Sequence, residues 1–398
     1  MNGISEILEQ IAGETGLNSG QILIGGLALL LMILLILVAF MGYFRILTHI
    51  ASFAYPVARV KALGNPFVGD EELATLAESH TLHELMEKIR DHGFELKLEE
   101  AAPLQDIDQT LDRYYLNELS LFIDSVPDSI RPFFTAFRSL SESEQLKTAI
   151  RGRHAGLHPE IIRSRMIAGG IVTPELIDGC AHSEKVDDIV SLLQETVYGK
   201  ALAEALSHYH EQGITLPLER ALDLTTLREI NRSKTRIDNS LAGPVREFCG
   251  IYTDITNILT VLRARTEGRD PAEASLSIVS GGAFYEDWRM RQLLETPTIP
   301  EILHQLSGTE YYAAISTAIP LYEETASVHP MEHELERYLL KKVGILSSTY
   351  HLTGGPLIRF IVARFIEVRN IRVLIHAFHG RIPVAAVSGQ LVTEGGMV

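Results

Sequence analysis

The chain of 398 residues is long enough for two or three ordinary domains, and its 46% hydrophobic and 22% charged residues are typical of a globular protein. With 35 Lys and Arg against 51 Asp and Glu, its formal charge of −16 would repel a nucleic-acid backbone, so nucleic acid is not an expected partner. Two cysteines do not support a disulfide framework. A mean hydropathy of +0.11 is high for so acidic a chain and indicates a concentrated apolar segment.

That segment lies near the N-terminus, where no charged residue occurs from Ile22 through Phe44. As a helix, this stretch would cross a hydrocarbon core of ~30 Å. It is too long for the apolar region of a cleavable signal peptide, and no Lys or Arg precedes it. We therefore predict a transmembrane helix over residues 21–45 that contacts the lipid bilayer through residues 22–44. A buried central helix of a large domain is the alternative.

The charges that flank the apolar segment predict its orientation. Acidic residues precede the segment and basic residues follow it: Glu6, Glu9 and Glu14, then Arg45, Arg59 and Lys61. By the positive-inside rule, the large C-terminal body is cytoplasmic. We therefore expect a single-pass protein of the cell membrane, with residues 1–20 as a short segment outside.

An internal repeat organises the rest of the chain. Three sets of residues recur at a spacing of 112: Pro132, Pro244 and Pro356; Gly156, Gly268 and Gly380; Pro159, Pro271 and Pro383. Apolar residues at helical spacing follow each first proline, and a glycine followed three residues later by proline is a typical helix end. The pattern predicts three copies of one helical unit.

The third copy is incomplete, because it starts at Pro356 and the sequence ends at Val398. Its missing half is found near the N-terminus, where residues 79–89 match residues 183–198 and 299–311 of the other copies. A repeat completed by the other end of the chain closes a ring and needs no terminal caps. We predict an all-α fold of three similar helical bundles around a pseudo-threefold axis, closed by the N- and C-terminal segments.

This repeat also predicts the domain organisation. We expect residues 46–130 and 355–398 to form the two halves of domain 1, residues 131–242 to form domain 2, and residues 243–354 to form domain 3. Together with the segments 1–20 and 21–45, these domains account for the whole chain.

Motifs for catalysis or cofactor binding are missing from the sequence. It contains no phosphate-binding GxxxxGK[ST] loop, and no GxGxxG follows a strand pattern. His329 and His333 are four residues apart, and His376 and His379 three apart, but a zinc site needs three or four ligands. We interpret these histidines as surface or capping residues, and we predict no catalytic residue, cofactor or metal.

The most specific polar group is Glu367, Asn370 and Arg372, which interrupts an otherwise apolar helix over residues 357–378. Glu367 and Asn370 are three residues apart and so share one helix face. Apolar neighbours place this face against other helices, where polar groups need hydrogen-bond partners. We predict that the group fixes the register of the helix, and a patch for docking a partner is the alternative.

Three stretches then point to a family. The first, Tyr55-Pro-Val-Ala-Arg59-Val-Lys-Ala, resembles the opening motif of the C subunit of the archaeal A-type ATP synthases, which is similar to the d subunit of vacuolar ATPases. The second is the Leu-x-x-Thr-x-Tyr ending, with Thr196 and Tyr198 in one copy and Thr309 and Tyr311 in the next. The third is the helix that opens at Pro356 and leads into Glu367-Val-Arg-Asn370-Ile-Arg372. The resemblance covers about residues 52–398.

This resemblance implies a funnel of three helical domains on the cytoplasmic face of the proteolipid ring, which receives the tip of the central-stalk axle. Such a chain would be a rotor subunit without an active site, used in ion-driven ATP synthesis. The family is soluble, so the membrane span is a departure from it. We hypothesise that residues 22–44 pass through the lumen of the ring. A membrane-tethered helical scaffold or signalling adaptor, unrelated to ATP synthesis, is the alternative.

Overall fold

A computed structural model describes residues 19–94 and 104–395. Over these ranges the chain is helical, and the only extended pairing is an isolated bridge between Gly169 and Val172. The predicted all-α fold class is therefore confirmed. The predicted extra-cytoplasmic segment, apart from its last two residues, lies outside the described residues.

The chain divides into two units, Met1–Ala54 and Tyr55–Val398. Helix α2 (Ser19–Leu63) includes the whole predicted span with its ends Ile22 and Phe44, and contributes to both units. By length and composition α2 could cross a membrane, and none of its most apolar window is buried. The alternative of a central helix buried in a soluble core therefore disagrees with the structure.

The second unit, called the body below, contains the remaining elements. In chain order they are η1 (Pro66–Val68), α3 (Asp70–Ala77), α4 (Leu82–Asp91), α5 (Leu104–Ser125), α6 (Arg131–His154), α7 (Pro159–Arg165), α8 (Pro174–His182), α9 (Val186–Leu192), α10 (Gly199–Gln212), α11 (Leu216–Ser233), α12 (Gly243–Thr266), α13 (Pro271–Ser275), α14 (Asp287–Glu295), α15 (Ile299–Leu306), α16 (Glu310–Ile315), η2 (Ser316–Ala318), α17 (Ile319–Thr325), α18 (His329–Thr349), α19 (Gly355–His379), α20 (Val384–Val387) and η3 (Ser388–Gln390).

Three long helices of the body, α6, α12 and α19, begin at the constant spacing that the prolines predict. The second residue of each is a proline, Pro132, Pro244 or Pro356, at a position where the missing N–H has no intrahelical partner to lose. Short helices that begin with or just after a proline follow each of them, namely α7, α13 and α20. The repeated prolines of the sequence thus mark repeated helix starts in the structure.

The ends of the long helices depart from the expected pattern in one copy. Gly156 and Gly268 follow α6 and α12 in the left-handed conformation, with φ of 68° and 65°. In the third copy the left-handed residue is Arg381, with φ of 54°, whereas Gly380 has φ of −77°. Gly380 is the C-cap residue of α19, so the predicted helix end is confirmed. The left-handed conformation falls one residue later than in the other copies, because α19 is one residue longer than α6 and α12.

The N-termini of the three long helices meet at one point. The residues that precede them are Ile130, Ala242 and Gly354. A Cβ atom on Gly354 would collide with the side chain of Ile130 and lie 3.4 Å from Cγ of Pro244. Equivalent ends of the three copies therefore converge, as a pseudo-threefold arrangement requires.

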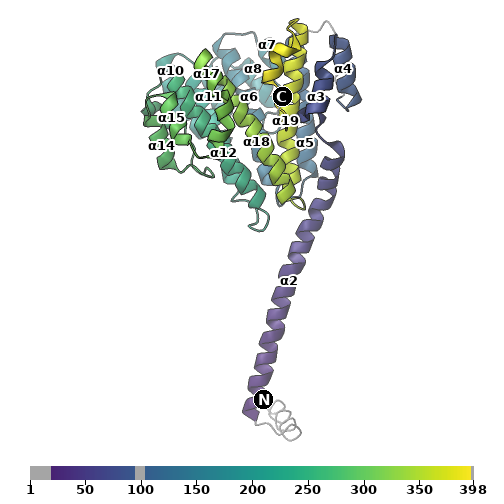
Figure 1. Ribbon diagram of the computed structural model, residues 1–398. Helices are drawn as coiled ribbons and strands as arrows, with labels where there is room; N and C mark the ends of the chain where they lie inside the picture. Colours follow the sequence, from purple (N-terminus) through teal and green to yellow (C-terminus); the bar gives the residue numbers. More distant parts are fainter. Residues whose placement is uncertain (1–18, 95–103, 396–398) are drawn as a thin grey trace. The chain divides into compact units, whose positions relative to one another are not determined.

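Six helices of the body pack in a closed cycle. Each long helix has a partner, so that α6 packs on α11, α12 on α18, and α19 on α5 (Figure 1). Contacts of α5 with α6, α11 with α12, and α18 with α19 join these pairs. Because α5 comes from the N-terminal part of the body and α19 from the C-terminal part, the predicted pairing of the chain's two ends closes the cycle.

Aromatic side chains fill the middle of this cycle. Phe133 of α6 and Phe248 of α12 are in edge contact, with ring centroids 5.5 Å apart. Phe122 of α5 lies 5.3 Å from Phe360 of α19 and 5.0 Å from Phe134 of α6. Side chains from all three copies thus share one apolar core, so the bundles are not separate globules.

Candidate functional site

Glu367, in the middle of α19, is fully buried and hydrogen-bonded. Its Oε1 accepts the backbone N–H of Phe67 at 3.2 Å, and its Oε2 pairs with Nη1 of Arg364 at 2.5 Å and accepts from Asn65 at 3.5 Å. Asn65 and Phe67 flank the start of η1, far earlier in the chain. This carboxylate therefore joins the two ends of the body.

Asn370, one turn further along α19, completes the junction. Its Nδ2 donates to the carbonyl oxygens of Phe67 at 2.9 Å and Val392 at 2.8 Å, and its Oδ1 accepts the N–H of Val392 at 2.9 Å. One fully buried amide thus binds both η1, which precedes α3, and the segment that follows η3. All of its hydrogen-bonding groups have partners, as a buried amide requires.

The same acid–amide pair occurs twice more in the body. Helix α6 carries Glu142 and Gln145, and α12 carries Asp254 and Asn257, each pair buried and three residues apart. Each amide oxygen accepts the backbone N–H of the residue 22 positions later: Ile167 for Gln145 at 2.8 Å, Val279 for Asn257 at 3.0 Å, and Val392 for Asn370 at 2.9 Å. The three sites are copies of one device.

The three acids also have equivalent partners. Each accepts the N–H of the residue three positions before a short helix, and these bonds are Ile171 to Glu142 at 3.3 Å, Phe284 to Asp254 at 2.7 Å, and Phe67 to Glu367 at 3.2 Å. In the first two copies the loop lies in the same stretch of chain as its acid, whereas in the third it comes from the N-terminal segment. The third copy is thus assembled from both ends of the body.

Burial raises the pKa of all three carboxyl groups above the ordinary values. For Glu367 desolvation raises the pKa to about 7, although Arg364, the Phe67 N–H and Asn65 all favour the charged form. Hydrogen bonds offset the free energy that is lost when these carboxyl groups are removed from water. These carboxylates contact backbone groups of their own chain, which is an arrangement for holding loops against helices.

A tyrosine stands beside two of these sites. The hydroxyl of Tyr311 donates to Oδ2 of Asp254 at 2.8 Å. The hydroxyl of Tyr198 instead donates to the carbonyl oxygen of Ser139 at 3.3 Å. The third copy has Phe94 at this position, and the guanidinium of Arg364 lies over its ring at 5.1 Å. Phe94 has no hydroxyl, so in this copy Arg364 donates to the acid, Glu367, as Tyr311 does to Asp254.

The threonines of the Leu-x-x-Thr-x-Tyr stretches form hydrogen bonds with nearby backbone groups. Thr196 donates through Oγ1 to the carbonyl oxygen of Leu193 at 2.6 Å, and Thr309 to that of Leu306 at 2.7 Å. Thr309 also caps α16 by accepting the N–H of Tyr312 at 3.1 Å. These contacts orient the buried tyrosines.

Arg372 lies on the seam between α19 and α5, where it pairs with Asp112 and, at 3.2 Å, with Asp108. His376 also contacts Asp108, at 2.8 Å. The arginine and both aspartates are partly exposed, so each pair adds modest stability.

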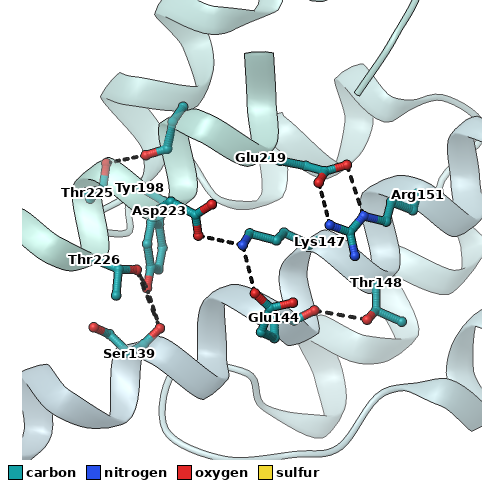
Figure 2. Close-up of polar contacts among 11 residues, drawn as sticks. Ser139, Glu144, Lys147, Thr148, Arg151, Tyr198, Glu219, Asp223, Thr225 and Thr226 are labelled. Atoms are coloured by element: carbon teal, nitrogen blue, oxygen red, sulfur yellow. Dashed lines mark hydrogen bonds and ion pairs between the residues drawn. The ribbon is translucent and has the colours of Figure 1, made fainter. Parts of the chain in front are cut away.

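The seam between α6 and α11 carries an equivalent set (Figure 2). There Lys147 pairs with Asp223 at 2.5 Å, and Arg151 pairs with Glu219. On the seam between α12 and α18, Arg263 and Glu332 pair at 2.6 Å. At least one ion pair therefore joins each of the three helix pairs.

The remaining predicted residues lie apart from the acid–amide sites. Tyr55 is 72% exposed and Arg59 is partly exposed, on the last turns of α2. Pro356 is buried at the start of α19. His329 pairs with Glu332 at 3.3 Å, and residues 19–94 and 104–395 contain no group of three or more potential metal ligands.

An open cleft of about 600 Å³ lies between α16 and α18. Its charged side chains are largely engaged with one another. Lys342 pairs with Glu310 at 2.5 Å, and Arg337 pairs with Glu334 at 2.8 Å. These pairs neutralise much of the charge that lines the cleft.

The sequence can also be compared with known protein families. The sequence matches the ATP synthase (C/AC39) subunit family over residues 56–388. The chain belongs to this family. The match contains all three acid–amide pairs, whereas Tyr55 lies one residue before it. The resemblance predicted from the sequence motifs is thus confirmed.

Curated relatives of this C/AC39 chain are named as the C subunit of A-type ATP synthases. The protein of Methanocaldococcus jannaschii is 28% identical over 335 residues, which cover 83% of this chain and 84% of the relative. That of Methanothermobacter thermautotrophicus is 28% identical over 330 residues, with 83% and 85% covered. That of Haloferax volcanii is 23% identical over 346 residues, with 85% and 97% covered.

Two of the three acid–amide pairs of this C/AC39 chain were not predicted from the sequence. Glu142 with Gln145 and Asp254 with Asn257 keep the spacing of 112, but the pair on α19 lies one position later than that spacing requires. A search at a fixed spacing therefore misses the correspondence. The signal that would find them is an acid and an amide three residues apart, with Asp or Glu and Asn or Gln treated as equivalent.

Proposed function

We propose that this chain is the C subunit of an A-type ATP synthase and acts there as a non-catalytic rotor component that links the central axle to the proteolipid ring. The observation that carries the proposal is the match to relatives of that name along more than four fifths of the chain. The closed cycle of helices supports it, because a socket that transmits torque must resist deformation around its axis.

The body, in this proposal, is a funnel of three domains, with residues 46–130 and 355–398 in domain 1, 131–242 in domain 2 and 243–354 in domain 3. The regular starts of α6, α12 and α19 support these boundaries. The role of the acid–amide pairs is to fix the loops to the long helices. Their burial supports this role over docking of a partner, since Glu367 and Asn370 have no exposed surface.

A non-catalytic role agrees with how the titratable groups are used. The buried acids accept hydrogen bonds from backbone N–H groups, and both cysteines are buried with the pKa of their thiols raised by desolvation. A buried, protonated thiol is a poor nucleophile. The acidic chain, with a formal charge of −16, would suit a basic axle tip.

The membrane part of the proposal concerns residues 22–44. We propose that they span the bilayer once, with the N-terminus outside and the body cytoplasmic. A span outside the ring is incompatible with rotation, since it would meet the stator on each turn. The lumen of the ring is therefore the location that we propose.

Co-purification tests the rotor role. If the tagged full chain is isolated from native membranes in mild detergent, the ring, axle and catalytic subunits should accompany it in fixed ratio. Recovery of the chain without these subunits would favour a membrane-tethered scaffold or signalling adaptor instead.

Crosslinking tests the location of the span. A photo-reactive group in place of Leu31, in the middle of the apolar segment, should react with the ring protein in the assembled complex. A matched group at Leu121, an exposed residue of α5 in the body, provides the control and should not react with the membrane-embedded part of the ring. Reaction from Leu31 with stator proteins, or with lipid alone, would contradict the proposed location.

A further inference from the structure

At one exposed position, two copies of the repeat have glutamate and the third has tryptophan. The second residue of the short helix after each acid-bound loop is Glu71 in α3, Glu175 in α8 and Trp288 in α14. Trp288 is the only tryptophan of the chain, and 56% of it is exposed. Because the same fold accepts glutamate at this position twice, folding does not require an aromatic residue there.

Trp288 belongs to a group of three side chains that we call the aromatic platform: Phe284, Trp288 and Arg289. The guanidinium carbon of Arg289 lies 5.3 Å from the ring centroid of Phe284 and 5.2 Å from that of Trp288. The indole N–H of Trp288 donates to Glu286 at 2.8 Å, which orients the ring. Phe284 is 49% exposed, although its equivalent Phe67 is fully buried.

These features fit a binding surface. Exposed aromatic rings that are already held in place lose little conformational entropy on binding, and Trp and Arg are the residues that most often contribute large binding energies. Arg289 stacks on both rings but forms no ion pair with any residue in the described ranges. Its guanidinium N–H groups therefore remain able to bind a carboxylate in a bidentate manner.

We propose that the aromatic platform is a docking site for a segment of another protein that presents a carboxylate next to an apolar side chain. The carboxylate would bind Arg289, and the apolar side chain would cover Phe284 and Trp288. A protein segment is favoured over an anionic membrane surface, because Glu286 and Asp287 flank the platform and a charged bilayer would meet both. A short protein segment can contact Arg289 without meeting either acid. The carboxylate of Glu286 is already bonded to Trp288, and that of Asp287 to Ser280.

This proposal explains an asymmetry that the rotor role does not. A body with three similar units offers three similar surfaces, and a platform on one unit lets a single partner bind in one orientation. It does not depend on which complex the chain belongs to. Failure of this proposal is therefore distinguishable from failure of the rotor proposal. If the rotor proposal fails, ring and axle proteins do not co-purify even with the wild-type chain.

Two substitutions make a matched test. Trp288→Glu introduces the residue that the other two copies have at this position. Val197→Glu is the control, because Val197 is 57% exposed and its equivalent in the next copy is Glu310. Both variants should unfold at the wild-type temperature, since the fold already accepts glutamate at both equivalent positions.

The partner is first identified by a photo-crosslinker in place of Trp288, used in the full chain in native membranes. We expect crosslinks to a protein segment that contains Asp or Glu within a few residues. Trp288→Glu should then reduce co-purification of that protein at least about tenfold, as for a residue that contributes strongly to binding, and Val197→Glu should not. Crosslinks to lipid alone, no crosslinks, or equal effects of the two variants would overturn the proposal.

Charge reversal tests the chemistry of the contact. Arg289→Glu should lose the partner, and substitution of the partner's crosslinked acid by Arg should restore it in combination. If the single variant binds as the wild type does, or if the combination fails to restore binding, Arg289 does not hold a carboxylate and the proposal is wrong in that respect.

Discussion

The backbone N–H of Phe67 donates a hydrogen bond to Oε1 of Glu367 at 3.2 Å, across 300 residues of chain. The equivalent bond from Phe284 to Asp254 spans only 30 residues. Breaking the bond within one copy would loosen a loop, whereas breaking the one on α19 would remove a link between the N-terminal segment and the last long helix. This third site therefore reinforces the closure that the packing of α5 on α19 provides.

Asn370→Leu should destabilise the body strongly. The change leaves the carbonyl oxygen of Phe67 and both backbone groups of Val392 without the partner that Asn370 supplies. A buried polar group left unpaired costs about 1–3 kcal/mol, so we expect the free energy of unfolding to fall by about 3 kcal/mol or more. Urea denaturation of the full chain in detergent measures this loss, and complex assembly should weaken with it.

Gln145→Leu is the control for closure. Gln145 accepts one backbone N–H, that of Ile167, so its loss should cost about 1–3 kcal/mol. It should not separate the chain ends, and limited proteolysis should cut its N-terminal segment as slowly as in the wild type. Equal loss of stability in both variants, or wild-type behaviour of Asn370→Leu, would contradict the closing role of Asn370.

The stability of the body should depend on pH through Glu367. Burial raises the pKa of Glu367 from 4.5 to about 7, so between these values the folded state binds more protons than the unfolded state. The contribution of Glu367 to stability is therefore largest below pH 4.5 and decreases as the pH rises to 7. The difference corresponds to at most about 3 kcal/mol.

Glu367→Gln isolates this contribution, because glutamine does not titrate and its carbonyl oxygen can still accept the N–H of Phe67. The free energy of unfolding, measured in urea from pH 5 to pH 8, should decrease less steeply for this variant than for the wild type. Glu142 and Asp254, whose pKa values are also raised by burial, contribute equally to both proteins. Parallel pH profiles would show that Glu367 stays charged over this range.

Side-chain patterns predicted much of this fold. The starts of α6, α12 and α19 follow from prolines at a constant spacing, because proline is tolerated in the first turn of a helix and is unfavourable in its interior. The end of α19 at Gly380 was also predicted, but one additional helical residue places the left-handed conformation at Arg381. A glycine in the sequence shows where that conformation is easy, and the length of the helix decides where it occurs.

The acid–amide sites could be predicted only in part. Apolar neighbours of Glu367 and Asn370 place them in the interior, but their partners are backbone groups of Phe67 and Val392. Every residue has such groups, so a sequence does not show which ones a buried side chain will bind. The site at Gln145 was not predicted for a different reason. Its two equivalents are Asn, and the exchange of Asn for Gln keeps the amide group but changes the residue type.

Tyr311→Phe should cost more stability than Tyr198→Phe. The hydroxyl of Tyr311 donates to the buried carboxylate of Asp254, whereas that of Tyr198 contacts the neutral oxygens of Ser139 and Thr226. Hydrogen bonds to charged groups contribute about 1.5–3 kcal/mol and neutral ones about 0.5–1.5 kcal/mol. Thermal unfolding of the two variants compares them directly. If Tyr198→Phe proves the more costly, the hydroxyl of Tyr311 does not support Asp254.

The convergence of the long helices can be tested at Gly354. A Cβ atom there would collide with the buried side chain of Ile130 and touch Pro244, so Gly354→Ala should reduce the free energy of unfolding by about 1–3 kcal/mol. Gly344→Ala is the matched control, because Gly344 lies inside α18 with open space at its Cβ. Alanine in a helix is favoured over glycine by about 0.5–1 kcal/mol, so the control should stabilise. Urea denaturation should therefore change in opposite directions, and stabilisation by both would mean that the three N-termini do not pack as closely as the structure has them.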